Sequence, residues 1–129
     1  MSLSIVHLSD LHFGDPTAVL NRHEVSRVLK ALLTKAGPDA TLVLSGDITF
    51  KGQQKGYDEA AEAMRGTLNE FGLSSHRIII CPGNHDIVKL GERQPSFGAF
   101  DAWSEGIRND KHCTFTATTC RQVVCESID

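Results

Sequence analysis

Three short polar segments of the sequence carry side chains that bind metal ions or move protons: residues 10–12, 46–47 and 83–86. Asp10 and His12 are two residues apart after an apolar run, so both can point the same way and offer one ion an oxygen and a nitrogen. The two oxygens of Asp47 can bridge two ions. Asn84 offers a neutral carbonyl oxygen, and His85 an imidazole that either binds metal or transfers a proton. Oxygen and nitrogen ligands without thiolate favour Mn, Fe, Zn or Ni over calcium or a thiolate-bound structural zinc, which predicts a hydrolytic centre with two divalent metal ions.

The same residues also have a purely structural interpretation. Asp10 and Asp47 can cap the helices that follow them, and residues 84–86 can form a turn after glycine. Neither capping nor turn formation accounts for two histidines in the same segments. We therefore favour the metal site over the structural interpretation.

Each polar segment follows a short apolar run, at residues 4–9, 41–45 and 77–81. These runs are rich in Ile, Val and Leu, as expected for strands that are buried on both faces of a parallel sheet. The carboxyl ends of parallel strands lie along one edge of the sheet, where ligands bind. The three polar segments are therefore expected to converge in space.

Apolar residues at helical spacing separate the three strands, which predicts an α/β fold with a βαβαβ order. The first helix ends at Gly37 and Pro38, and the second at Gly72. The expected buried positions are Leu20, Val25, Val28, Leu29, Leu32 and Ala36 in the first helix, and Tyr57, Ala60, Ala61, Met64, Leu68 and Phe71 in the second. Phe97, Phe100, Trp103 and Ile107 predict a third helix opened by Pro95 and Ser96, and residues 113–125 a strand or hairpin.

Length and composition bound the class of protein. The 129 residues, 40% of them hydrophobic, suit one globular domain, and the formal net charge of -3 gives no signal for nucleic acid as an electrostatic partner. No apolar run is long enough for a membrane helix and no signal peptide is recognisable, so we expect a cytoplasmic protein without a membrane partner. The four cysteines are too sparse for a zinc knuckle or a disulfide framework; we expect buried or half-buried free thiols, with Cys81 packing at the strand end instead of acting as a nucleophile.

The three polar segments together resemble the calcineurin-like metallophosphoesterase superfamily. Asp10-Leu11-His12, Gly46-Asp47 and Gly83-Asn84-His85-Asp86 look like its first three sequence blocks, in order and at βαβ spacing. Either of the first two would be weak alone, whereas G-N-H-D after an apolar strand is rare. The resemblance covers residues 4–88, and residues 46–57 look closest to the phosphodiesterase-like branch.

The resemblance implies a role for each site residue. Asp10 and His12 would bind the first metal, Asp47 would bridge two divalent ions, and Asn84 would bind the second. His85 would act near the leaving-group oxygen as general acid or transition-state stabiliser. A catalytic contribution of Asp86 would come through orienting His85 or the turn. The implied reaction is hydrolysis of a phosphate ester, most simply a phosphodiester, by a metal-bound hydroxide.

The sequence departs from the family pattern because it contains no later G-H-x-H block. The first metal then keeps three protein ligands and the second two. The implied fold is a four-layer α/β/β/α sandwich, of which residues 1–129 would form a single, incomplete domain lacking its C-terminal half. Two helices would cover one side of the sheet, leaving the third helix and the C-terminal residues for the other. The missing half or a homo-oligomer would have to cover apolar surface that stays exposed.

Three classes of function follow from these observations. The leading one is a metal-dependent phosphoesterase. The second is a catalytically incomplete or vestigial domain that serves as an interaction or assembly module. The third is a nucleotide binder of flavodoxin-like topology, which the lack of a glycine-rich phosphate loop disfavours.

Overall fold

The computed structural model of the chain describes residues 3–18, 20–88 and 96–110. Its centre is a three-stranded parallel sheet with the order β1-β2-β3, formed by β1 (Ser4–Ser9), β2 (Ala40–Ser45) and β3 (Ile78–Cys81). The register places Ser9, Ser45 and Cys81 in one row across the sheet. The predicted α/β fold is confirmed, and each strand begins and ends within one residue of its predicted limits.

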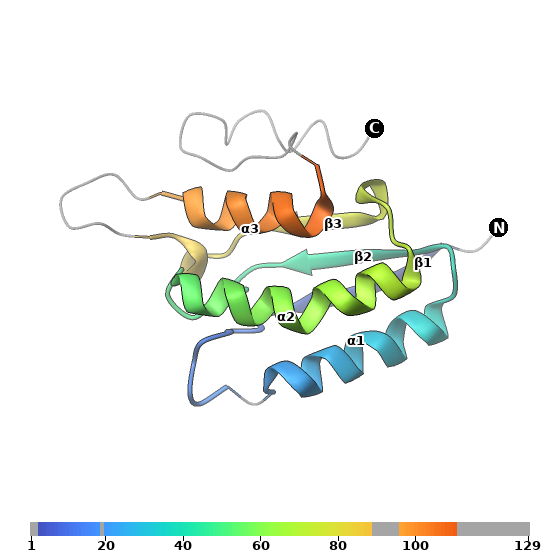
Figure 1. Ribbon diagram of the computed structural model, residues 1–129, viewed down its shortest axis with the longest axis horizontal. Helices are drawn as coiled ribbons and strands as arrows, with labels where there is room; N and C mark the ends of the chain where they lie inside the picture. Colours follow the sequence, from blue (N-terminus) through green and yellow to red (C-terminus); the bar gives the residue numbers. More distant parts are fainter. Residues whose placement is uncertain (1–2, 19, 89–95, 111–129) are drawn as a thin grey trace.

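Helices α1 (Arg22–Ala36) and α2 (Gln54–Phe71) connect the strands, and α3 (Gly98–Arg108) follows them (Figure 1). Two short 3-10 helices, η1 (Ser75–Arg77) and η2 (Asn84–Asp86), flank β3. Helix α1 begins with a capping box, in which the Asn21 side chain accepts the N–H of Glu24 and the Glu24 carboxylate accepts the N–H of Asn21. Gly72 ends α2 in the left-handed conformation, as its position in the sequence predicts.

The buried face of α1 differs from the predicted one. Val25, Leu29 and Leu33 are buried, whereas Val28 and Leu32 remain 37% and 38% exposed. Apolar residues stand in adjacent pairs at 28–29 and 32–33, so helical spacing alone is compatible with either face. Packing against the sheet and α2 selects the face that carries Leu33.

All three helices lie on one side of the sheet, where α2 contacts both α1 and α3 (Figure 1). Phe100, Trp103 and Ile107 of α3 join the same core as Tyr57 of α2 and Ile80 of β3. The expectation that the third helix serves the other side of the sheet is therefore wrong. Helix α3 packs beside α2 on the helical side of the sheet, where the Trp103 ring contacts the Tyr57 ring.

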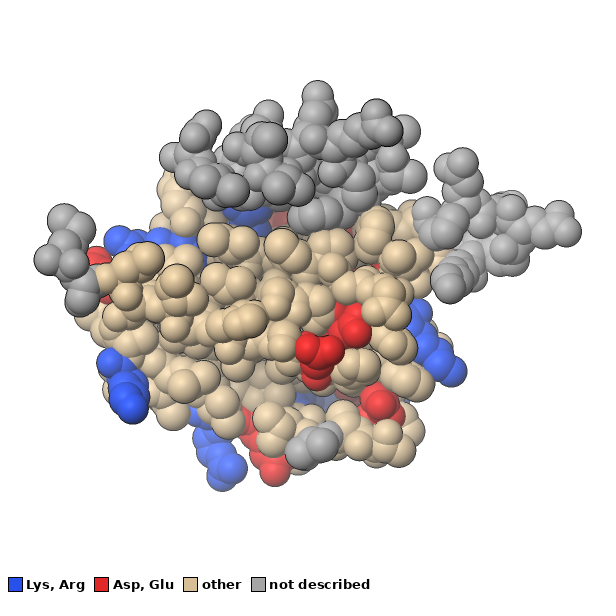
Figure 2. Space-filling model, turned by 180° about the vertical axis from the view of Figure 1, so that it is seen from behind, with Lys and Arg blue, Asp and Glu red and all other residues tan. Residues whose placement is uncertain are grey.

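The strands are buried on one face only, so the expectation of burial on both faces is also wrong. Val6, Leu42 and Ile78 point to the helices, whereas Ile5 of β1 is 59% exposed. The side chains on the other face of the three strands form the uncovered sheet face: Ile5, His7, Ser9, Thr41, Val43, Ser45, Ile79 and Cys81. Figure 2 shows the molecule from this side, where uncharged residues predominate and lysine and arginine lie mainly at the margins.

Cys81 is a free thiol and is exposed on this face, contrary to the packed position expected for it. Partial burial still raises the pKa of the Cys81 thiol. The other three cysteines and the predicted strand or hairpin at residues 113–125 lie outside the described residues. Within the described residues, no helix combines the length and the apolar character that crossing a membrane requires.

Candidate metal centre

Backbone hydrogen bonds join the loops that follow β1 and β2 into one unit. The N–H groups of Asp10, His12 and Phe13 donate to the carbonyl oxygens of residues 46, 47 and 48, over distances of 3.1, 3.0 and 2.9 Å. The N–H of Phe50 returns a bond to the carbonyl of Phe13, at 3.1 Å. The sheet pairing therefore continues past the strand ends, which fixes the two loops that carry the candidate ligands.

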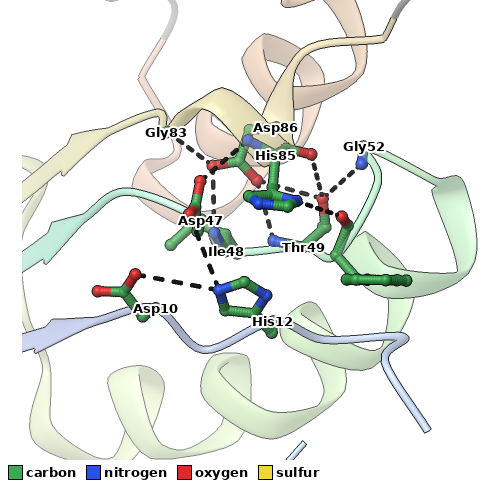
Figure 3. Close-up of polar contacts among 10 residues, drawn as sticks. Asp10, His12, Asp47, Ile48, Thr49, Gly52, Gly83, His85 and Asp86 are labelled. Carbon is green, nitrogen blue, oxygen red and sulfur yellow. Dashed lines mark hydrogen bonds and ion pairs between the residues drawn. The ribbon is translucent and has the colours of Figure 1, made fainter. Parts of the chain in front are cut away.

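The structure brings Asp10, His12 and Asp47 together at this edge of the sheet (Figure 3). Each offers a ligand atom, and these atoms all lie within 4.8 Å of one another. His12 Nε2 lies 3.9 Å from Asp10 Oδ1 and 3.8 Å from Asp47 Oδ2, which is too long for hydrogen bonds. Atoms that ligate one ion at about 2.1 Å stand roughly 3 to 4 Å apart, so this spacing suits a shared ion.

All three residues have backbone angles in the left-handed region, where side chains other than glycine are uncommon. The φ angles are 54° at Asp10, 49° at His12 and 50° at Asp47. Asp and His adopt this region more readily than most residues, but it is still less favourable than ordinary extended or helical backbone. The surrounding backbone hydrogen bonds fix this geometry, and the donor set and its placement fit a divalent metal.

Asn84 is exposed and stands at the start of η2. Its side chain makes none of the hydrogen bonds found among the described residues. The next residue anchors the turn, because the N–H of His85 donates to Asp47 Oδ1 at 3.0 Å. The structure therefore brings the third polar segment beside Asp47, and the role of Asn84 as a ligand stays a prediction.

The His85 ring faces the same edge of the sheet as His12, with ring centres 5.1 Å apart. His85 Nδ1 lies 2.8 Å from the carbonyl oxygen of Phe50. A carbonyl only accepts hydrogen bonds, so Nδ1 carries the proton and Nε2 is left for a proton or a ligand. The Phe50 and His85 rings also stack, with 6.1 Å between their centres and 14° between their planes.

Asp86 is fully buried and binds the turn instead of the His85 ring. One carboxylate oxygen accepts the N–H groups of Ile48 and Gly83, at 3.1 and 2.9 Å, and the other accepts the N–H of Thr49, at 2.9 Å (Figure 3). A carboxylate can satisfy several donors at once, which offsets the free-energy cost of its burial. Asp86 thereby links the loop after β2 to the turn after β3.

Two further residues complete this link, and no pattern in the sequence indicates that either reaches the site. The Thr49 hydroxyl donates to Asp86 Oδ1 at 3.2 Å and accepts the N–H of Gly52 at 2.8 Å. The Tyr57 hydroxyl donates to the carbonyl oxygen of Asp86 at 3.2 Å. Tyr57 was assigned to the apolar face of α2, and nothing in helical spacing indicates that its hydroxyl reaches the site.

Comparison with known proteins agrees with this geometry. A family model described as calcineurin-like phosphoesterase matches residues 3–126. The uncharacterized metallophosphoesterase-like protein YydB of Bacillus subtilis (strain 168) is 32% identical over 91 residues. The aligned part is 69% of this chain and spans 18% of the length of that relative. Because the family model covers nearly the whole sequence, the chain belongs to the calcineurin-like phosphoesterase family.

Proposed function

We propose that this chain carries the metal-binding part of a metal-dependent phosphoesterase, and that its substrates are phosphodiesters. The observation that supports this most directly is the convergence of Asp10, His12 and Asp47 at the carboxyl edge of the sheet. A capping role for the two aspartates would not require a histidine nitrogen between them.

Two divalent ions would be held by four residues, with Mn, Fe, Zn or Ni as the candidates. Asp10, His12 and Asp47 would bind the first, and Asp47 and Asn84 the second. When bound, such ions supply positive charge for the phosphoryl oxygens and a water molecule of lowered pKa. The short distance from Asp47 Oδ1 to the N–H of His85 supports a shared role for these two loops.

His85 is proposed to transfer a proton at the leaving-group oxygen. Its Nδ1 is bound to the carbonyl of Phe50, which fixes the ring orientation and leaves Nε2 to face the substrate side. Asp86 contributes by holding the turn that carries His85, since its carboxylate binds backbone N–H groups on both sides of the site. We therefore propose a positioning role for Asp86.

Three protein ligands do not fill the coordination of a Mn or Fe ion. Water, substrate or a further protein segment would take the other positions, and we propose that residues 1–129 form only part of a complete domain. The uncovered sheet face favours a second function, in which the chain is an interaction or assembly module. An assay for metal-dependent hydrolysis separates the two.

The test is hydrolysis of bis(p-nitrophenyl) phosphate with added Mn²⁺ by the unaltered chain, by Asp47→Ala and by Asp39→Ala. Asp39 lies at the opposite edge of the sheet and is paired with Arg77, so it controls for loss of a carboxylate. We expect turnover that Asp47→Ala lowers by at least about 100-fold, as losing a group that acts with others in a site commonly does. Turnover that survives Asp47→Ala, or none with any of the four metals, would reject catalysis here and favour the module.

A further inference from the structure

Lys51 is the only lysine or arginine in the three site loops as the structure describes them, at residues 10–18, 46–53 and 82–88. The same loops carry four aspartates. Such a cation can pair with one of the carboxylates, stay in solvent or bind an anionic ligand. The contacts of Lys51 bear on this choice.

The Lys51 ammonium lies against an aromatic ring and not against a carboxylate. Its Nζ is 4.9 Å from the centre of the Phe50 ring, and it forms no ion pair with another described residue. The Phe50 ring stacks on His85 and lies 6.4 Å from the ring of His12. Lys51 is therefore placed one aromatic ring away from both histidines of the site.

The backbone on both sides of Lys51 is fixed, whereas its ammonium group is free to move. The carbonyl of Phe50 is bound by His85, and the N–H of Gly52 donates to the Thr49 hydroxyl. A lysine has a long flexible stem, so Nζ can leave the ring and reach an anion that enters the site. The cation–π contact of an exposed lysine contributes only about 0.5–1 kcal/mol, which makes such a movement cheap.

We propose that Lys51 selects substrates that carry a second phosphate group beside the phosphoryl group that is cleaved. This inference rests on the proposed function, in which bound ions hold the cleaved group. The Lys51 ammonium lies on the Phe50 ring, which stacks on His85, and would meet a phosphate that neighbours the cleaved group. Lysine is a common partner for phosphate oxygens as a point charge. The substrate class is thus a diester of diphosphate, in which the cleaved phosphodiester group is joined to a second phosphate.

Binding of three non-hydrolysable ligands to the Mn²⁺-loaded chain tests this by calorimetry, with free Mn²⁺ kept in excess. Methylphosphonate has one anionic group, methylenediphosphonate has two, and phosphonoacetate replaces the second by a carboxylate. The variants are Lys51→Met, Lys51→Arg and the control Lys35→Met. Lys35 lies in the last turn of α1, at the opposite edge of the sheet.

We expect Lys51→Met to weaken methylenediphosphonate binding about tenfold more than methylphosphonate binding, because one charge-assisted hydrogen bond is lost. Lys51→Arg should stay within about threefold of the unaltered chain, since the charge remains. Lys35→Met should leave both affinities unchanged. If Lys51→Met weakens phosphonoacetate binding to the same extent, Lys51 recognises any second anion. That result would overturn its selectivity for a second phosphate.

Equal loss of both affinities in Lys51→Met would overturn the proposal, because Lys51 would then serve the cleaved group itself. Two affinities that Lys51→Met leaves as they are would overturn it as well. So would an unaltered chain that binds methylenediphosphonate no more tightly than methylphosphonate. Absence of Mn²⁺-dependent bis(p-nitrophenyl) phosphate hydrolysis contradicts the proposed function instead, and the affinity ratio still decides the role of Lys51.

Discussion

The backbone N–H of His85 donates a 3.0 Å hydrogen bond to Asp47 Oδ1, while the other oxygen of the same carboxylate faces His12. One side chain thus connects the loop after β2 to the turn after β3 and to the loop after β1. Asp47 is only 14% exposed, whereas Asp10 is 69% exposed. Asp47 is therefore a structural link as well as a candidate ligand.

Replacing Asp10 by glycine and by alanine separates binding from backbone strain. Both variants lose a carboxylate, so Mn²⁺ affinity should fall at least about tenfold in each. Removing a residue that only hydrogen-bonds to a metal ligand already costs about that much. Glycine tolerates the φ of 54°, so Asp10→Gly should be more stable than Asp10→Ala by about 1 kcal/mol. Calorimetry with Mn²⁺ and urea unfolding measure the two quantities. Equal stabilities would mean that the left-handed backbone carries no strain.

Gly83 is required because its Cα lies against Asp47. A Cβ at residue 83 would overlap Oδ1 and the backbone nitrogen of Asp47. Gly83→Ala should therefore lower the free energy of unfolding by about 2 kcal/mol or more and weaken Mn²⁺ binding. The control is Gly66→Ala on α2, where a Cβ meets no atom within 4 Å and stability should rise by about 0.5–1 kcal/mol. Retained Mn²⁺ affinity in Gly83→Ala would contradict this account of the turn.

Asp86→Asn tests the buried carboxylate that links the loops. An amide cannot accept from all the N–H donors of Ile48, Thr49 and Gly83, and its own NH₂ group would face one of them. We expect a loss of at least about 3 kcal/mol in urea unfolding. Asp58→Asn on the exposed face of α2 is the matched control, with a change below about 0.5 kcal/mol. A similar small change for Asp86→Asn would show that the link is not needed.

Alkaline pH should destabilise the fold through Tyr57, the single tyrosine of the sequence. Burial, followed by the charge of Asp86, raises the pKa of the Tyr57 hydroxyl. The folded chain then keeps a proton that the unfolded chain releases near pH 10, so stability is intact below that pH and falls as the pH rises above it. Tyrosinate absorbance should appear together with unfolding. Titration of Tyr57 near pH 10 in a chain that stays folded would refute the argument.

Tyr57→Phe is the companion variant for this pH dependence. It removes the hydrogen bond to the carbonyl of Asp86, so it should cost about 1 kcal/mol at pH 7. The fall in stability above pH 10 should become less steep than in the unaltered chain. Urea unfolding at several pH values compares the two slopes.

The uncovered sheet face should promote self-association in solution. Ile5→Lys places a charge on this face and should lower the average mass in concentration-dependent light scattering. Leu32→Lys, at an exposed position of α1 on the other side of the molecule, should leave self-association as it is. A monomer at all concentrations, before any substitution, would show that this face needs no partner in water.

The strands and the convergence of the polar segments could be predicted from sequence because both follow from local patterns. Apolar runs locate β1, β2 and β3, and the parallel arrangement brings their ends together. The faces could not be predicted, since they depend on which neighbours are present. The apolar run of β1 predicts burial on both faces, whereas the helices cover only one face of the sheet.

The site was predictable in its residue types but not in its connections. Short spacing pairs Asp10 with His12, and the parallel strand order places Asp47 at the same edge of the sheet. The hydrogen bonds that Asp86 accepts from the N–H groups of Ile48 and Thr49 join residues 38 and 37 positions apart, and no local pattern signals them. The left-handed backbone was also invisible, because glycine, its usual marker, is absent at these three positions.

The left-handed angles at Asp10 and His12 have a consequence for laboratory evolution. Glycine at either position would relieve strain, so a screen that rewards only heat resistance or expression yield would favour it. Under the proposed function, such a screen would enrich well-folded chains that have lost a metal ligand. Selection for this protein therefore needs a readout for the ion itself at every round.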